Sequence, residues 1–220
     1  MTMPELILKD VTYRYPRVKY NTLHEINASF AAGTMTSIRG QSGAGKSTLL
    51  YLIAGLDRPT RGQLLWDGAP VGDLSAYRRK VVGTISQSYL LFPTRTALEN
   101  VCYPLELNKV PAAQAQARAR QLLASVGLKP ELYGRLPAKL SGGEQQRVAI
   151  ARCLAADAQV IAADEPTGNL DEENTKNIVA LLQRLAHEEN KVVIVVTHDP
   201  TVAASADVQM TLNAGILACN

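Results

Sequence analysis

Eight residues near the N-terminus have the types and the spacing of a phosphate-binding loop. The stretch reads Gly40-Gln41-Ser42-Gly43-Ala44-Gly45-Lys46-Ser47 and fits the pattern G-x-x-x-x-G-K-[ST]. Its glycines let the backbone bend so that N–H groups point at phosphate oxygens. Lys46 could reach the β- and γ-phosphates of a nucleotide, and the Ser47 hydroxyl could ligate Mg²⁺. The alternative is a glycine-rich turn without a ligand, but strand-like residues at 34–38 and helix-like residues at 48–54 favour the nucleotide site.

Two adjacent carboxylates follow an apolar stretch later in the chain. Asp164 and Glu165 come directly after the predicted strand at 160–163. In P-loop enzymes an aspartate at this position helps to hold Mg²⁺. A neighbouring carboxylate could accept a proton from an attacking water, as a general base. Such pairs also occur as solvated strand ends, so this assignment depends on the P-loop upstream.

A second candidate anion site lies within the stretch 140–147. There Ser141-Gly142-Gly143-Glu144 has the form of a capping box that opens a helix. The serine hydroxyl, two unobstructed backbone N–H groups and the positive helix end together favour an anion. The P-loop already supplies one anion site for the γ-phosphate of a bound nucleotide, so that phosphate does not need a second site from the same subunit. The second site would have a use if another copy of the chain, facing in the opposite direction, presented its own γ-phosphate there.

The elements predicted around these motifs form a β-rich first third, a helical middle and an α/β end. Apolar patterns predict strands at 6–15, 26–30, 34–38, 63–66, 81–86, 160–163, 192–196, 208–212 and 216–218. The first third contains one predicted helix, directly behind the P-loop. Later helices are predicted from 96, at 111–126, from 141 through 154, and from a cap at 171 through 185. The continuous apolar run at 192–196 is typical of a parallel strand buried on both faces.

These patterns predict an α/β fold of P-loop type with an antiparallel β portion near the N-terminus. We expect one domain over residues 1–220, in which an α/β core at 1–88 and 157–220 carries an inserted helical subdomain at 89–156. Hydrophobic residues make up 46% of the chain, which is enough for a core of this size.

Charge, cysteines and the start of the chain bear on location and partners. The net charge of +3 is explained by a solvated surface, so nucleic acid is not expected as a partner. Cys102, Cys153 and Cys219 are far apart, which favours reduced thiols in the cytosol over zinc or disulfides. There is no basic-then-apolar signal segment, and the run at 192–196 is far shorter than the roughly 20 residues that span a bilayer. We expect a soluble chain whose membrane role depends on a partner.

Taken together, the motifs resemble those of the nucleotide-binding subunit of an ATP-binding cassette (ABC) transporter. The stretch 140–147 is similar to the family signature, 40–47 to the Walker A motif, and 160–164 to the Walker B motif, which Glu165 follows. The motifs stand in family order along essentially the whole chain. The resemblance implies an ABC ATPase fold, ATP and Mg²⁺ as ligands, and hydrolysis of ATP to ADP and phosphate.

The resemblance also implies roles for individual residues. The catalytic residues would be Glu165 as the base, His198 as a contact to the γ-phosphate, Lys46, and Gln87 as a contact to Mg²⁺ and the attacking water. Tyr15 would stack on adenine, with Tyr13 as the competing choice. The implied nucleotide-binding residues are Tyr15, Gly40, Gln41, Ser42, Gly43, Ala44, Gly45, Lys46, Ser47, Thr48, Ser141, Gly142, Gly143, Glu144 and Asp171, and the implied metal ligands are Ser47, Gln87 and Asp164. Asp171, in a loop that would cross the dimer interface, could equally be a helix cap, and the two roles are compatible.

By the same resemblance, two subunits would pair head to tail around two ATP molecules. Integral membrane permease subunits would be further partners, with the chain cytoplasmic and peripheral on the inner face of the membrane. Residues 91–101 and 163–171 are similar to a branch that includes lipoprotein-releasing, macrolide-export, antimicrobial-peptide-efflux and cell-division ATPases. Two departures bear on the membrane partner: the stretch 86–89 lacks the usual phenylalanine-flanked glutamine, and 208–217 lacks the usual charged turn.

We therefore expect an ATPase subunit that powers a membrane transporter or a mechanotransmission complex, in export, efflux or the handling of lipoproteins or peptides. The alternative is a regulatory ATPase of the cell-division type, which controls a membrane-partnered hydrolase. A soluble ABC protein of DNA repair or translation would carry two cassettes or a long insertion, and the 220 residues contain neither. A P-loop kinase or GTPase has no need of the 140–147 stretch.

Overall fold

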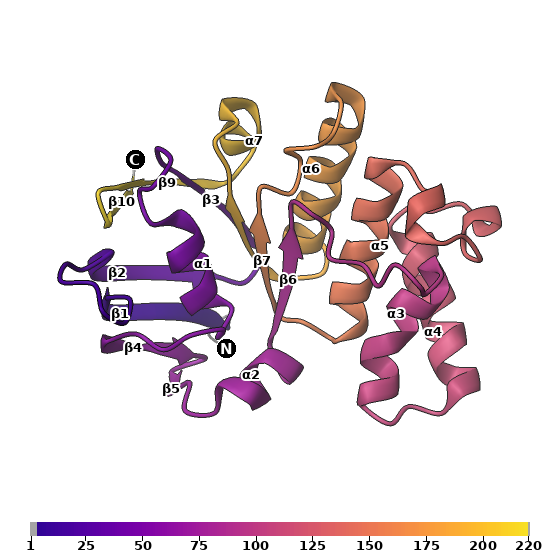
Figure 1. Ribbon diagram of the computed structural model, residues 1–220, viewed down its shortest axis with the longest axis horizontal. Helices are drawn as coiled ribbons and strands as arrows, with labels where there is room; N and C mark the ends of the chain where they lie inside the picture. The colour runs from indigo at the N-terminus through magenta and orange to yellow at the C-terminus, as the bar shows by residue number, and fades with distance from the viewer. Residues whose placement is uncertain (1–3, 220) are drawn as a thin grey trace.

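Two β-sheets form the frame of the molecule (Figure 1). The computed structural model describes residues 4–219, so residues 1–3 and 220 of the predicted domain lie outside the described residues. The smaller sheet is antiparallel, with the order β2-β1-β4-β5, and contains β1 (Glu5–Tyr13), β2 (Leu23–Ala31), β4 (Arg61–Trp66) and β5 (Ala69–Pro70). The larger sheet has the order β10-β9-β3-β8-β7-β6 and contains β3 (Thr34–Arg39), β6 (Val82–Ser86), β7 (Val160–Asp164), β8 (Val192–Val196), β9 (Val208–Asn213) and β10 (Ile216–Cys219). This mixed α/β architecture confirms the predicted fold class.

The parallel strands of the larger sheet end in register at one edge. β9, β3, β8, β7 and β6 are parallel neighbours, and β10 pairs antiparallel with β9. One row of paired residues crosses the strand ends: Ile38, Val196, Asp164 and Ser86. The loops that follow β3, β8, β7 and β6 therefore leave the sheet side by side, where ligands of parallel sheets bind.

The larger sheet is buried on both faces at its central strand β8. On β8, Val192, Ile194 and Val196 belong to a core shared with the smaller sheet and with α1 (Lys46–Ile53). Val193 and Val195 face the opposite core, which includes α6 (Glu172–His187). The predicted doubly buried parallel strand is confirmed, and α1 is held between the two sheets with its N-terminus at the strand ends (Figure 1).

The middle of the chain forms a group of helices beside β6. They are α3 (Ala97–Leu107), α4 (Ala112–Ser125) and α5 (Gly142–Ala155), with single 3-10 turns at Pro130–Leu132 and Pro137–Lys139. A capping box opens α3 at Thr96 and another opens α5 at Ser141, as predicted. Their core is continuous with the one under α6, and a Cβ on Gly83 of β6 would collide with Cys153 of α5. The division at 89 and 156 stays a prediction.

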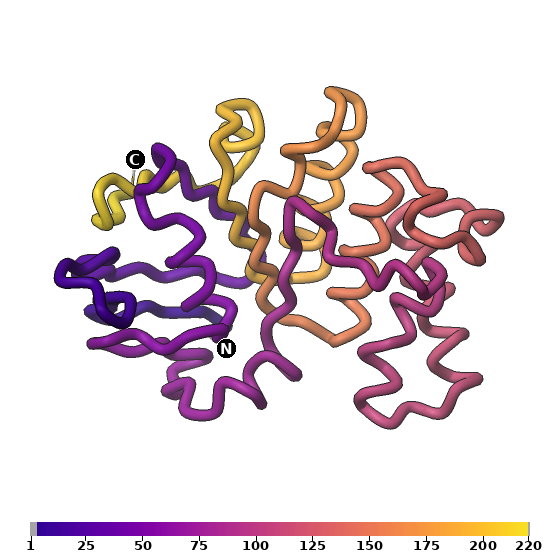
Figure 2. The backbone as a smooth tube through the Cα atoms, in the orientation of Figure 1, coloured from indigo at the N-terminus to yellow at the C-terminus, as the bar shows by residue number. Residues whose placement is uncertain are grey.

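The C-terminal segment packs beside the N-terminal strands. Figure 2 shows the C-terminal segment beside the N-terminal strands, where the His24 N–H donates to the Gly215 carbonyl oxygen at 2.9 Å. No helix within residues 4–219 has both the length and the apolar character that crossing a bilayer requires.

Two short helices, α2 (Leu74–Lys80) and α7 (Pro200–Ala204), were not predicted. Because α2 lies between β5 and β6, the expectation of one helix in the β-rich first part of the chain was wrong. α2 begins at Asp73, whose side chain accepts the N–H groups of Ser75 and Ala76. α7 begins at Asp199, with proline in the first turn. Both helices carry the cap signals of a helix start, but each is too short to show an apolar period.

Asp207 joins α6, β3 and the start of β9. Its Oδ2 accepts the Met35 N–H at 2.8 Å and lies 2.9 Å from His187 Nε2. Burial alone would raise the pKa of Asp207, but the hydrogen bonds with His187 and Met35 outweigh it and lower the pKa. The ionised carboxylate therefore stabilises the fold above its unfolded pKa, and this contribution is lost as the pH falls through the folded pKa.

We expect Asp207→Asn to lower the free energy of unfolding at neutral pH by about 1 kcal/mol, because asparagine keeps an acceptor for Met35 but loses the charge. The difference from the wild type should be present at neutral pH and shrink as the pH falls below about pH 4. Urea unfolding followed by circular dichroism measures it, with Asp67→Asn in the exposed β4–β5 turn as the control. A difference that persists undiminished at about pH 3 would mean that the carboxylate charge is not its source.

Candidate functional site

The strand ends surround an open cleft of about 450 Å³. The P-loop forms one wall. The lining also includes Asp164 at the end of β7, Glu165 directly after it, Gln87 after β6, and Tyr15 and Thr22 from the β1–β2 loop. Residues predicted from separate stretches of sequence are therefore brought together in one place.

The P-loop, residues 40–47, curls around its own lysine. Lys46 Nζ donates to the carbonyl oxygens of Gly40 at 2.8 Å and Gln41 at 3.0 Å. Gly45 caps α1 with φ of 102°, a conformation that strongly favours glycine. A Cβ on Gly40 would collide with the Leu212 carbonyl group in β9. The glycines are thus required by the loop's own backbone, and the N-terminus of α1 opens into the cleft.

Glu165 and His198 form a hydrogen-bonded pair. Glu165 has φ of 45°, and its N–H donates to the Val196 carbonyl oxygen at 2.9 Å. Glu165 Oε1 lies 2.7 Å from His198 Nδ1, and Oε2 accepts the His198 N–H at 3.3 Å. The side chain of Glu165 is 15% exposed, against 72% for His198. The histidine therefore orients the carboxylate and remains open to a further partner.

Asp164 and Ser47 offer oxygen atoms of the kind that Mg²⁺ prefers. Burial raises the pKa of Asp164 and the charge of Glu165 adds to this, while Lys46 and a hydrogen bond with the Ser47 hydroxyl oppose it. A cation here would offset the cost of the buried charge. Within residues 4–219, no group of three His, Cys, Asp or Glu side chains is arranged so that it could hold a metal ion by itself. Mg²⁺ commonly binds through one or two protein oxygens plus phosphates and water, so these residues with the Gln87 amide oxygen fit it.

The structure distinguishes the two candidate tyrosines. Tyr13 is 4% exposed and its hydroxyl donates to Asp57. Burial, with the Asp57 hydrogen bond, raises the pKa of Tyr13 to about 12. Tyr15 is 39% exposed and lines the cleft, with its hydroxyl 2.9 Å from Thr48 Oγ1. Tyr13 is thus a core residue of the smaller sheet, and of the two it is Tyr15 that offers ring surface to the cleft.

Gln87 is anchored to the loop that follows β7. Asn169 Nδ2 donates to the Gln87 carbonyl oxygen at 3.0 Å, and Gln87 Nε2 lies 3.4 Å from Asn169 Oδ1. A Cβ on Gly168 would lie 2.8 Å from Gln87 Nε2. The two loops are packed tightly, so a displacement of one must displace the other.

Residues 141–144, the Ser141 turn, do not line this cleft. Ser141 Oγ accepts the Glu144 N–H at 3.3 Å, and Glu144 Oε2 accepts the Ser141 N–H at 2.7 Å. Glu144, predicted to bind nucleotide, here serves the helix cap. Among the described residues, the N–H groups of Gly142 and Gly143 have no acceptor and remain the donors at this helix end. Asp171 caps α6 in the same way, accepting an N–H in its first turn at 2.8 Å.

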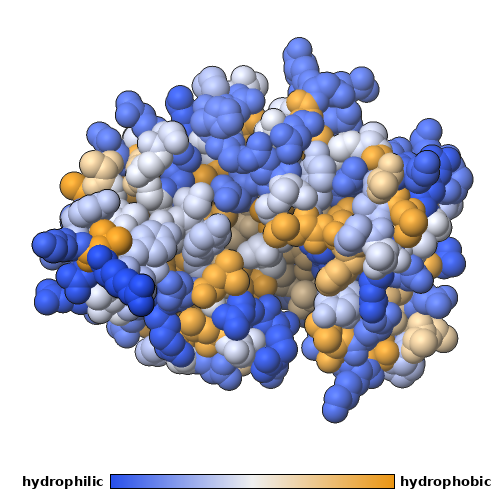
Figure 3. Space-filling view, viewed as in Figure 1, coloured by the Kyte–Doolittle hydropathy of each residue, from blue (hydrophilic) through white to orange (hydrophobic). Residues whose placement is uncertain are grey.

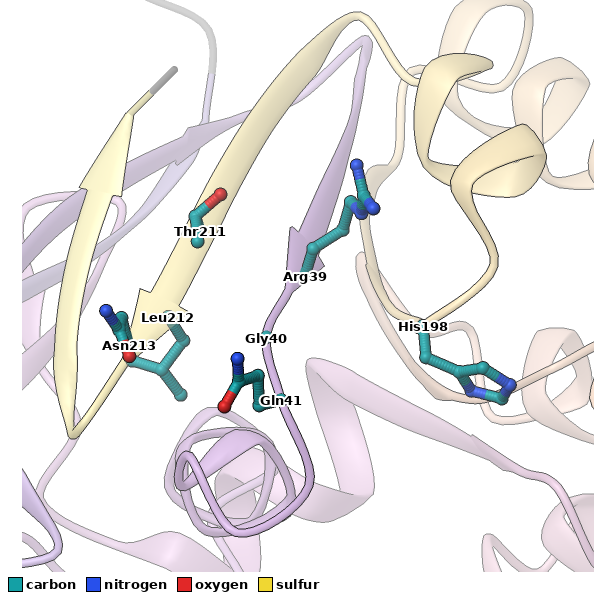
Figure 4. Close-up of a pocket in the computed structure, with 7 residues that line it drawn as sticks. All are labelled: Arg39, Gly40, Gln41, His198, Thr211, Leu212 and Asn213. Atoms are coloured by element: carbon teal, nitrogen blue, oxygen red, sulfur yellow. The ribbon is translucent and has the colours of Figure 1, made fainter.

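A second cleft of about 430 Å³ lies beside the start of the P-loop (Figure 4). Its lining residues are Arg39, Gly40, Gln41, His198, Thr211, Leu212 and Asn213. In Figure 4, Gly40 and Gln41 at the start of the P-loop lie between the end of β9 on one side and His198 on the other. The predicted residues Gly40, Gln41 and His198 therefore line this cleft, whereas Ser42, Gly43, Gly45, Lys46 and Ser47 line the first one. Ala44, also predicted to bind nucleotide, is buried and lines neither cleft.

Two contributors to the site, Thr22 and Gly168, were not among the predicted site residues. Thr22 lines the first cleft, and its carbonyl oxygen would lie 3.2 Å from a Cβ on Gly45. Gly168 leaves room for Gln87. Both act through loops that pack on residues from distant parts of the sequence. Gly168 lies within the stretch 163–171 that resembles one branch of the family, whereas no sequence signal pointed to Thr22.

Comparisons with known proteins agree with one another. The family model described as "ABC transporter" matches residues 23–168. The chain is 40% identical over 215 residues to the uncharacterized ABC transporter ATP-binding protein YclH of Bacillus subtilis (strain 168), covering 97% of this chain and 95% of that protein. A dimeric post-hydrolysis state of the ATP-binding cassette MJ0796, bound to ADP and Pi, is 37% identical over 96% of both chains with a TM-score of 0.87. CbiO1 of Clostridium perfringens, part of the ABC transporter complex cbiONQ, is 27% identical, with a TM-score of 0.87 over 97% of this chain and 86% of that chain.

The matched segment includes the P-loop, Gln87, the Ser141 turn and the acidic pair after β7. The fold, the cleft at the strand ends and these likenesses confirm the predicted family, without distinguishing its branches. The chain belongs to the ABC transporter family, as an ATP-binding and ATP-hydrolysing subunit.

Proposed function

We propose that two copies of this chain enclose two ATP molecules, each held by the P-loop of one copy and the Ser141 turn of the other. The observation that carries this proposal is the separation of the two anion sites. Gly142 packs against Asn169 and Leu170 in the loop after β7, so the turn lies at the same edge of the sheet as the P-loop. It is nevertheless absent from the lining of the P-loop cleft. A two-fold pair places each turn opposite the other copy's loop, and the cassette MJ0796 is dimeric in its solved structures.

In this pair, different residues of the chain bind the ATP, activate the attacking water and stabilise the developing charge. Tyr15 stacks on the adenine, and Lys46 with the P-loop N–H groups holds the β- and γ-phosphates and stabilises the charge that develops on them. The Glu165 carboxylate takes a proton from the water that attacks the γ-phosphorus as the bond to ADP breaks. His198 contacts the γ-phosphate and keeps the carboxylate oriented, and Gln87 positions the water.

The proposed Mg²⁺ would be held by Ser47, Asp164 and Gln87, together with phosphate oxygens. When bound, it supplies positive charge to the phosphates. From the second copy, the N–H groups of Gly142 and Gly143 approach the γ-phosphate, with Ser141 and Glu144 fixing that helix end.

We further propose that integral membrane permease subunits bind this dimer at the inner face of the membrane. Figure 3 shows hydrophobic side chains gathered in a hollow between the smaller sheet with α2 and the helices α3 to α5. Leu90, before α3, is 66% exposed and Leu107, at the end of α3, is 61% exposed. Exposed apolar surface of this kind favours a protein contact. The stretches 91–101 and 163–171 support export, efflux or lipoprotein and peptide handling. The relatives named as transporter proteins favour a transport role over the regulatory alternative.

Lys46→Ala tests the nucleotide site. Loss of a charge-assisted contact to phosphate should weaken ATP binding by about 10- to 100-fold. Isothermal titration with ATP and Mg²⁺ measures the affinity, and Lys129→Ala, on the exposed surface of the helical region, is the matched control. An affinity equal to that of the control would remove Lys46 from the phosphate cradle.

A further inference from the structure

A third cleft, of about 440 Å³, lies where β1, β2 and β4 meet the β1–β2 loop. Its lining residues, none of them predicted to bind nucleotide or metal, are Thr12, Arg14, Asn21, His24, Glu25, Thr60 and Arg61. Among the ion pairs within residues 4–219, none involves Arg14 or Arg61. This basic cleft therefore gathers two cations whose charge is available to an anionic ligand.

The three strands beside the basic cleft are all irregular at about the same level. Asp10 of β1 and Glu25 of β2 have left-handed φ values of 51° and 47°, and Gly62 of β4 has φ of 76°. The pairing of β1 shifts register there against both neighbours. Asn27 holds the two bulges together, because its Nδ2 donates to Asp10 Oδ1 at 3.0 Å and to the Glu25 carbonyl oxygen at 3.2 Å. Bulges of this kind redirect side chains and are common next to functional sites.

The redirected groups form a set of hydrogen-bond donors. Thr12 Oγ1 accepts the Glu25 N–H at 3.1 Å, and Thr60 Oγ1 accepts the Arg14 N–H at 3.0 Å. Each hydroxyl acts as an acceptor in these bonds, so its own proton is available for donation into the cleft. The carboxylate of Glu25 is outweighed in charge by the guanidinium groups of Arg14 and Arg61. Guanidinium forks combined with hydroxyl donors are well matched to a phosphate group.

More positive charge lies next to the basic cleft. An adjoining cleft of about 490 Å³ shares Arg14 and Thr60 with it and is also lined by Arg17 and Lys19. The whole chain has a net charge of only +3, so positive charge is concentrated on this part of the surface. Such a concentration raises the local concentration of anions.

Consecutive residues of the β1–β2 loop divide between the basic cleft and the P-loop cleft. Arg14 lines the basic cleft and Tyr15 lines the P-loop cleft, and Asn21 and Thr22 repeat this division. The Thr22 N–H donates to the Tyr13 carbonyl oxygen at 2.8 Å, which closes the base of the loop. A ligand that holds Arg14 and Asn21 together therefore also restricts Tyr15 and Thr22.

We propose that the basic cleft binds the phosphate group of a small soluble anion, and that this anion is an effector of nucleotide binding. The bound anion orders the loop that carries Tyr15, so less ordering remains to be done when the nucleotide arrives, and nucleotide affinity rises. By reciprocity, nucleotide raises the affinity for the anion by the same factor. The anion site is separate from the proposed ATP site, and only its effect on nucleotide rests on the proposed stacking of Tyr15 on adenine.

Nuclear magnetic resonance titration of the ADP-saturated chain with inorganic phosphate tests the site. The amide resonances of Asn21 and Thr60 should shift along a saturable curve, and Arg61→Gln should weaken this binding by about tenfold. Arg14→Gln provides a second variant in case Arg61→Gln does not fold. Arg118→Gln, on the exposed face of α4, is the matched control and should bind like the wild type. The Gly43 resonance reports any phosphate that enters the P-loop cleft instead.

Isothermal titration with ADP, without phosphate and with saturating phosphate, tests the effector role. Phosphate that competes at the P-loop lowers ADP affinity equally in the wild type and in Arg61→Gln. The ratio of ADP affinities with and without phosphate should therefore be about fivefold higher in the wild type than in Arg61→Gln.

The outcomes separate the site, its effect and the proposed function. Equal phosphate affinity in the wild type, Arg14→Gln and Arg61→Gln would overturn the site, and Arg61-dependent binding with no difference in the ADP ratio would overturn the effector role. Flotation with phosphatidylglycerol vesicles that depends on Arg61, without a shift from inorganic phosphate, would assign the cleft to a lipid headgroup and overturn the soluble effector. A chain that binds no ADP would contradict the proposed function, whereas the phosphate titration run without nucleotide would still decide for or against this site.

Discussion

Glu165→Gln is expected to slow steady-state ATP hydrolysis by about 10²- to 10⁴-fold while ATP-bound dimers accumulate. In the wild type, Glu165 Oε1 lies 2.7 Å from His198 Nδ1. Glutamine keeps the shape of the side chain and an oxygen for this contact, but it cannot take a proton from water. The P-loop and the Ser141 turn are untouched, so ATP binding and dimer closure should proceed. Phosphate release and size-exclusion chromatography in ATP measure the two effects.

The matched control is Glu131→Gln, an exposed carboxylate in the 3-10 turn Pro130–Leu132. It should hydrolyse ATP at the wild-type rate and form no lasting dimer. Wild-type turnover in Glu165→Gln would remove Glu165 from the role of base. Loss of turnover together with loss of ATP affinity would point to a damaged binding site and would likewise contradict the assignment.

Features whose signal is local could be predicted from the sequence. The P-loop and the capping box at Ser141 each specify backbone geometry within a few residues, and both were found where expected. The run at 192–196 was long and uniform enough to identify β8 as doubly buried. Because β3, which leads into the P-loop, and β8 end at the same edge of one sheet, identifying these two strands indicated where the cleft lies.

Features that depend on distant packing could not be predicted in the same way. The resemblance favoured Tyr15 over Tyr13, but the physical reason, burial of Tyr13 against Asp57, involves a residue 44 positions away. The seating of Gln87 on Gly168 and of Tyr89 on Gly142 also arises from loops that meet in space. α2 and α7 were missed for a different reason, because seven and five residues are too few to display a period.

Ser141→Arg is expected to abolish ATP-dependent dimerisation and turnover while the ATP affinity of the monomer stays within about twofold. The new side chain would fill the space that the other copy's γ-phosphate occupies, and the P-loop cleft does not contain residue 141. Loss of the cap also weakens α5 by about 1 kcal/mol. Thr96→Arg is the matched control, because Thr96 forms the equivalent capping box at the start of α3. It should lose the cap and still dimerise.

Mixing two inactive variants then separates a shared site from two complete ones. Lys46→Ala disables the P-loop half, and Ser141→Arg disables the turn half. In a head-to-tail dimer of one variant with the other, both lesions fall on the same ATP site and the second site has two intact halves. Random pairing should therefore restore about a quarter of the sites, read as ATP occluded and hydrolysed in a single turnover. If each subunit carried a complete site, both variants would stay inactive in the mixture, and the separation of the Ser141 turn from the P-loop cleft would need another explanation.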